Sequence, residues 1–136
     1  MAWFEDLQAC TYFRGDCAHL LAVGWLEQGR PFLRGRCTPE FTARLEQLMK
    51  GPWTPEDFMG PHFCDLCPPR TVTGHTNLFV PAEEAVYVAP ELVTHYIARH
   101  GYRPPDQFIR AVMACPPMHS PEYLAAVLRH YRPPER

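Results

Sequence analysis

Sixteen of the 136 residues are proline, and they restrict where helices and strands can begin and end. Proline fixes φ and lacks a backbone N–H, so it is favoured in the first turn of a helix and disfavoured in the interior. Thr38-Pro39-Glu40 and Ser120-Pro121-Glu122 each combine a capping hydroxyl, a proline at the first helical position and an acid in the first turn. These tripeptides predict helices that begin at residues 39 and 121.

Pro90 and the proline pair at 104–105 each precede apolar residues that are spaced as on one face of a helix. The first of these helices is predicted to run from Pro90 to about His100, with Gly101 as its C-terminal cap. The second is predicted to begin at residues 104–105 and to end before the proline pair at 116–117. The sequence therefore predicts about four helices.

The predicted strands lie mainly before these helices. The apolar run 20–26 predicts a buried strand, and residues 77–80 and 86–88 predict a hairpin joined by a five-residue loop. Residues 51–70, rich in proline and glycine, are predicted to be irregular. Because strands come early and helices cluster late, we expect one α+β domain over residues 1–136, with a small antiparallel sheet.

Composition and charge exclude several classes of protein. A net charge of −2 argues against a nucleic-acid-binding protein, which usually carries a basic excess. No apolar run approaches the roughly 20 residues of a membrane span, and residues 1–6 lack the features of a secretory signal. We therefore expect a cytoplasmic protein, not bound to a membrane, whose six cysteines are reduced.

A Cys-x-x-Cys pair and a downstream histidine pair suggest a metal site. Cys64 and Cys67 have the spacing of a zinc knuckle, in which one turn brings both thiolates to a single ion. His95 and His100 are separated by four residues, within the histidine spacing of zinc fingers. The sequence between Cys67 and His95 is longer than in a compact finger, but a hairpin folding back would bring the predicted helix to the knuckle. We predict a zinc knuckle joined to a helix.

His62 competes for a place in this site, because it lies two residues before Cys64 and would face the same way in an extended strand. Five candidate ligands, Cys64, Cys67, His95, His100 and His62, therefore compete for the four positions of a tetrahedral zinc. Two readings without metal also remain open for the cysteines: an unmetallated thiol pair and a redox dithiol. The second would require a βαβ pattern around the motif, and none is visible.

Five motifs along the chain form a combined pattern: Asp6-Leu7-x-x-Cys10-Thr11-Tyr12-Phe13, Val23-Gly24-Trp25-Leu26-Glu27, Gly60-x-His62-x-Cys64-x-x-Cys67, Asn77-Leu78-Phe79-Val80-Pro81 and Tyr87-x-x-Pro90-Glu91-Leu92-x-x-His95-Tyr96-Ile97-x-x-His100-x-Tyr102-x-Pro104-Pro105. Together they resemble a family of short uncharacterised bacterial proteins. The resemblance covers most of the chain, and its most specific parts are the His-x-Cys-x-x-Cys and His-Tyr-Ile-x-x-His elements. It implies a bacterial, cytoplasmic protein in which His62 matters as well as His95 and His100. It implies no established activity.

A site with two thiolates is typically a closed structural site, so the leading hypothesis is a zinc-stabilised interaction or regulatory domain that binds a protein partner. The alternative is a zinc-dependent hydrolase, in which three ligands leave one position for water and a nearby acid serves as the base. The acids nearest in sequence are Asp65, Glu83, Glu84 and Glu91, and none belongs to a His-Glu-x-x-His arrangement. A finger that binds nucleic acid is a third reading, which the acidic charge disfavours.

Overall fold

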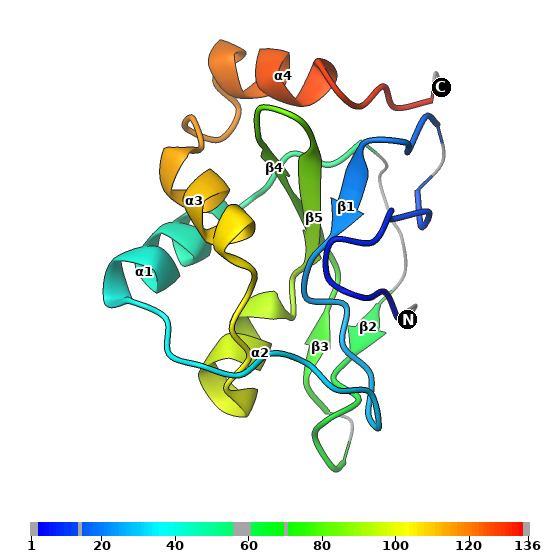
Figure 1. Ribbon diagram of the computed structural model, residues 1–136, viewed down its shortest axis with the longest axis vertical. Coiled ribbons are helices and arrows are strands. Elements are labelled where there is room, and N and C mark those ends of the chain that lie inside the picture. The colour runs from blue at the N-terminus through cyan, green and yellow to red at the C-terminus, as the bar shows by residue number, and fades with distance from the viewer. Residues whose placement is uncertain (1–2, 14, 56–60, 70, 135–136) are drawn as a thin grey trace.

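The computed structural model describes residues 3–13, 15–55, 61–69 and 71–134. Its centre is a hairpin of two five-residue strands, β4 (Asn77–Pro81) and β5 (Val86–Pro90), to which the short strand β1 (Leu20–Ala22) adds beside β5 (Figure 1). The hairpin is antiparallel, but β1 runs parallel to β5, with Leu20 opposite Val86. The sheet is therefore mixed, and the predicted antiparallel pairing holds for the hairpin.

All ten residues of the hairpin strands are buried, so both faces of the sheet are covered. Phe79 packs against Phe13 and Tyr131 on one face. Tyr87 packs on the other face, against Phe108 of α3 (Asp106–Ala114). In Figure 1 the helices α1 and α3 lie together on one side of the sheet. The core thus lies between the hairpin and the segments that cover it.

The helices confirm the prediction of an α+β fold with about four helices. In α1 (Pro39–Leu48), the Oγ1 of Thr38 accepts a hydrogen bond from the Phe41 N–H. In α4 (Pro121–Leu128), the Oγ of Ser120 accepts one from the Tyr123 N–H. Both predicted caps are therefore present. None of the helices in the described part of the chain is long and apolar enough to cross a membrane.

The second helix, α2 (Val93–His100), begins later than predicted. Pro90 pairs with Asn77 as the last residue of β5, where its missing N–H ends the strand instead of opening a helix. The predicted C-terminal cap is confirmed, because Gly101 adopts a left-handed φ of 69° and its N–H donates to the Tyr96 carbonyl.

Two strand predictions also need correction. The predicted strand 20–26 ends at Ala22, since Gly24 turns the backbone to a φ of 78°. Part of the segment predicted to be irregular is ordered, because β2 (His62–Phe63) pairs antiparallel with β3 (Thr73–Gly74). Residues 56–60 and residue 70 of that segment lie outside the described residues.

Candidate metal centre

The β2–β3 hairpin presents both cysteines at one point. The Cys64 N–H donates to the Val72 carbonyl over 2.9 Å, which continues the ladder between the two strands. The chain then turns through Asp65 and Leu66 before Cys67, so that both sulfur atoms end on the same side of the turn. This part of the predicted knuckle is confirmed as a local structure.

The helix α2 supplies two imidazoles to the same point. His95 lies in the first turn of the helix and His100 is its last residue, and their ring centroids are 5.0 Å apart. Gly101 ends the helix directly after His100. The end of α2 and the cysteine turn thus face each other across a short gap.

The four side chains, which we call the metal centre, approach one another closely. The Nε2 of His100 is 3.4 Å from the Sγ of Cys64 and 3.2 Å from the Sγ of Cys67. The Nε2 of His95 is 3.3 Å from the Sγ of Cys67, and the four ligand atoms all lie within 4.8 Å of one another. A tetrahedral zinc with ordinary bond lengths has sulfur–nitrogen edges of about 3.5 Å. The metal centre is therefore positioned to bind a metal ion.

Local electrostatics supports ligation. Burial lowers the pKa of both His95 and His100, which favours the neutral imidazole that a metal ligand needs. Burial raises the pKa of the Cys64 thiol, and the backbone amides of Leu66 and Cys67 oppose this by hydrogen-bonding to the sulfur. Amides directed at a sulfur atom stabilise the thiolate and orient it toward an ion.

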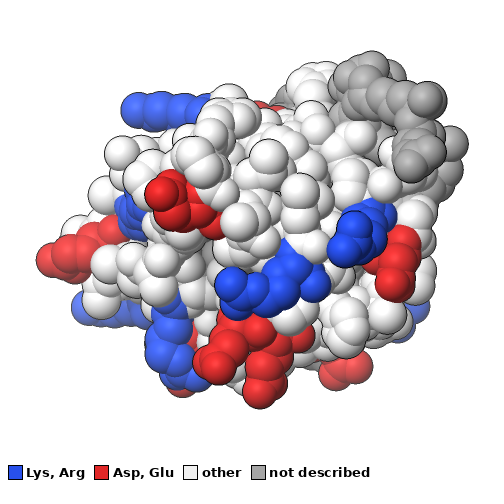
Figure 2. Space-filling model, turned by 90° about the horizontal axis from the view of Figure 1, so that it is seen from above, with Lys and Arg blue, Asp and Glu red and all other residues white. Residues whose placement is uncertain are grey.

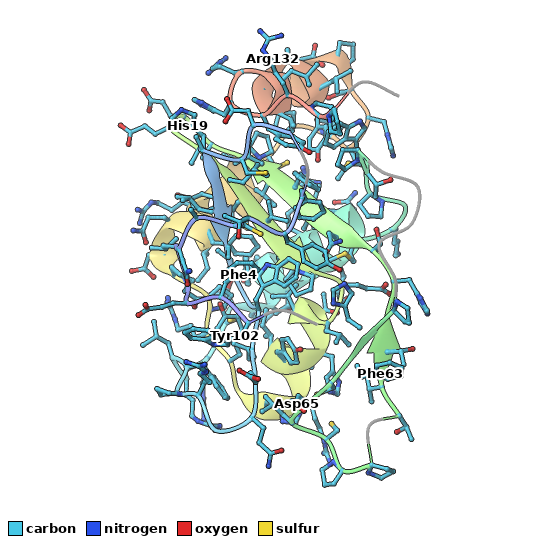
Figure 3. All side chains as sticks on the ribbon, turned by 90° about the vertical axis from the view of Figure 1, so that its right-hand side faces the viewer. Phe4, His19, Phe63, Asp65, Tyr102 and Arg132 are labelled. Atoms are coloured by element: carbon cyan, nitrogen blue, oxygen red, sulfur yellow. The ribbon has the colours of Figure 1, made fainter. Side chains whose placement is uncertain are left out.

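Three hydrogen bonds attach the two segments that carry the metal centre to the loop 26–35. The Oδ2 of Asp65, in the cysteine turn, accepts from the Gln28 N–H over 2.9 Å. The guanidinium of Arg34 donates to the His100 carbonyl over 3.0 Å, and the Gly35 N–H donates to the Gly101 carbonyl. Asp65 lies toward the lower end of the molecule in Figure 3, close to α2 in that view. Both halves of the site therefore hold the same loop.

His62, the fifth candidate, lies apart from this group. Its side chain is 2% exposed and packs between the rings of Tyr12 and Trp25, with centroids 5.8 and 5.7 Å away. Neither ring nitrogen has a hydrogen-bond partner among the described residues. The structure thus brings together Cys64, Cys67, His95 and His100, and places His62 outside this group, in the aromatic core.

The acids considered as possible bases are placed elsewhere or are already engaged. The Oε1 of Glu91 accepts from the backbone N–H groups of His75 and Thr76, at 2.7 and 3.2 Å. Glu83 and Glu84 lie in the turn between β4 and β5, at the opposite end of that hairpin from α2 (Figure 1). Asp65 accepts the hydrogen bond from the Gln28 N–H in the loop 26–35.

Sequence reasoning missed one residue that joins the two halves of the site. A Cβ at Gly74 of β3 would lie 3.1 Å from the Cβ of Glu91 and 3.4 Å from the Cγ of Leu92. The glycine therefore lets β3 approach the start of α2 closely, which holds the cysteine turn near the helix. A glycine inside a strand often marks such an approach, so Gly74 was a signal that could have been used.

Comparison with known proteins gives a family but no described activity. The model of a family described as a domain of unknown function (DUF7919) matches residues 2–113, which include all four residues of the metal centre. The chain matches none of the curated proteins and none of the solved structures with which it was compared.

Proposed function

Since this chain belongs to the family described as a domain of unknown function (DUF7919), we propose its role from the metal centre itself: the protein is a zinc-stabilised interaction or regulatory domain. The observation that carries the proposal is the convergence of two cysteines and two histidines from separate segments within 4.8 Å. Two thiolates and two imidazoles in a tetrahedral arrangement are a ligand set that suits zinc.

The geometry supports a structural site more than a catalytic one. Four protein ligands fill a tetrahedral coordination shell, whereas a catalytic zinc keeps one position for water. A hydrolase would also need a base beside the ion, and the engaged position of Glu91 argues against that role. The ion would instead fasten the cysteine turn to α2, and through them the loop 26–35.

For such a domain, a protein is the partner that the surface favours over a nucleic acid. Phe63 lies immediately before Cys64 in the sequence and is 46% exposed, so an apolar side chain projects from β2 into solvent (Figure 3). On the face shown in Figure 2, basic and acidic side chains are interspersed, which does not favour binding to a nucleic acid backbone. Reduced thiols at the metal centre fit a cytoplasmic location.

We expect the purified protein to contain about one zinc per chain. Elemental analysis of protein produced with zinc present and kept under reducing conditions is the measurement. The matched control is a variant in which Cys64 and Cys67 are both serine, which should contain no stoichiometric metal. A parent protein without zinc, or with another metal in stoichiometric amount, would contradict the assignment.

We further expect a chelator competition to distinguish the three histidines by the effect of their substitution on zinc affinity. His95→Ala and His100→Ala should each weaken zinc binding by more than the roughly 100-fold that loss of an outer-shell group can cost. His62→Phe should leave zinc affinity within about tenfold of the parent, because it keeps a ring in the space between Tyr12 and Trp25. Release of zinc by His62→Phe, with one of the helical histidines dispensable, would instead make His62 the ligand.

A further inference from the structure

A partly open cavity of about 810 Å³ lies outside the metal centre. Its walls come from residues 3–7, from the loop 26–35 and from the start of α3. This volume is in the range of pockets that hold small molecules. The aromatic side chains Trp3, Phe4 and Phe32 line it, together with several leucines and prolines. An occupant of the cavity would therefore have an apolar body.

The charges around this cavity are not balanced. Arg103 forms an ion pair of 2.8 Å with Asp106, and Arg30 forms one of 3.2 Å with Glu27, so each lining guanidinium already has a carboxylate. Two lining carboxylates, Glu5 and Asp6, have no cationic partner among the described residues. Within the part of the chain that the structure describes, the charge left uncompensated in the cavity wall is therefore negative.

Asp6 is the more enclosed of these two acids. Its Oδ1 accepts from the Gly24 N–H over 3.0 Å and its Oδ2 accepts from the Tyr102 hydroxyl over 2.7 Å, so both of its donors are neutral. Burial raises the pKa of Asp6, and the neighbouring charge of Glu5 raises it further. A cation bound in the cavity would supply the compensation that neither neutral donor provides.

Two aromatic walls of the cavity already carry a cation. The guanidinium of Arg34 already lies 4.4 Å from the ring centroid of Phe32, and that of Arg30 lies 4.0 Å from the ring of Trp3. Aromatic faces attract ammonium and guanidinium groups through their negative quadrupole, and the attraction grows where water is excluded. The ring faces of Trp3 and Phe32 that these guanidinium groups cover are already occupied. The charge of a ligand would therefore be directed to the two carboxylates, and its apolar body to the remaining aromatic surface of the cavity.

We propose that this cavity binds a small organic cation, an ammonium or guanidinium group on an aromatic or alkyl body, with the charge directed to Glu5 and Asp6. The proposal does not depend on the identity of the metal, because none of the lining residues belongs to the metal centre.

The three tryptophans make the test specific. Trp3 lines the cavity, whereas Trp25 is buried and donates its indole N–H to the Val88 carbonyl, and Trp53 packs against Phe79. Two-dimensional NMR of the indole N–H groups, during titration of the full chain with 2-phenylethylammonium, should show a saturable shift of the Trp3 signal alone. The neutral 2-phenylethanol should bind about tenfold more weakly, and 3-phenylpropionate should produce no saturable shift.

Charge-removing variants complete the test. Asp6→Asn should weaken binding of 2-phenylethylammonium about tenfold, and Glu5→Gln about two- to fivefold. Glu84→Gln, in the turn between β4 and β5, removes the same charge far from the cavity and should change nothing. Glu5 is exposed, so its variant keeps the test valid if Asp6→Asn does not fold. Equal or tighter binding of 3-phenylpropionate, no saturable Trp3 shift with 2-phenylethylammonium, or unchanged affinity in the folded charge variants would overturn the proposal.

Discussion

Replacing Cys67 by serine should abolish zinc binding and lower the free energy of unfolding by about 4 kcal/mol at free zinc roughly 1,000-fold above the dissociation constant. An ion that binds the folded protein stabilises it by mass action, and serine is a poor zinc ligand at neutral pH. For a chain of this length the expected fall in melting temperature is on the order of 10 °C. Thermal unfolding and metal analysis of the same samples measure both effects.

Cys37→Ser is the matched control, since Cys37 is also a half-buried cysteine but lies outside the metal centre. It should keep the zinc and cost less than about 1 kcal/mol. Removal of zinc from the parent protein with a chelator should lower stability as much as Cys67→Ser does, and should hardly affect the Cys67→Ser protein. A Cys67→Ser protein that keeps both its metal and its stability would exclude Cys67 as a ligand.

Gly24→Ala should destabilise the protein by about 3 kcal/mol for two separate reasons. A side chain at a φ of 78° costs about 1–2 kcal/mol. The new Cβ would also lie 2.8 Å from the Cγ2 of Val93, a buried β-branched residue in α2 whose χ1 is fixed by the helix. Relieving that contact by shifting the backbone costs about 1–3 kcal/mol more. Chemical denaturation measures the change.

Gly29→Ala separates the two costs. Gly29 has a φ of 86°, but a Cβ there would meet no atom within 4 Å, so only the backbone cost should appear. Adding Val93→Ala to Gly24→Ala should recover part of the loss, making the double variant more stable than the sum of the single effects predicts. Equal effects of Gly24→Ala and Gly29→Ala would show that Val93 is not the obstacle.

Much of the metal centre could be predicted, because the features that form it depend on residues close together in the sequence. Two residues between Cys64 and Cys67 fix a turn that joins their sulfur atoms, and Gly101 marks the helix end directly after His100. Local signals also placed α1 and α4, since hydroxyl caps and first-turn prolines depend only on nearby residues. The place of His62 was left open by its spacing, which suited a ligand and a core residue equally well.

The features that could not be predicted from the sequence depend on contacts between distant segments. Pro90 is compatible with both a helix start and a strand end, and only its pairing with Asn77 decides between them. The direction of β1 relative to β5 has no local signature, because each strand alone reads as an apolar run. The cavity draws its walls from three separated segments, so no pattern along the chain could reveal it.

The parallel pairing of β1 with β5 has a consequence for how the chain is made. Leu20 and its partner Val86 are 66 positions apart. The indole N–H of Trp25 likewise donates to the carbonyl of Val88, which follows it far along the chain. During synthesis the first strand therefore emerges well before the hairpin that receives it, while all four metal ligands lie between residues 64 and 100. We expect the hairpin and metal centre to assemble as a unit soon after residue 100 leaves the ribosome. Until then, we expect the apolar segment around Trp25 to lack the strand and the carbonyl with which it pairs.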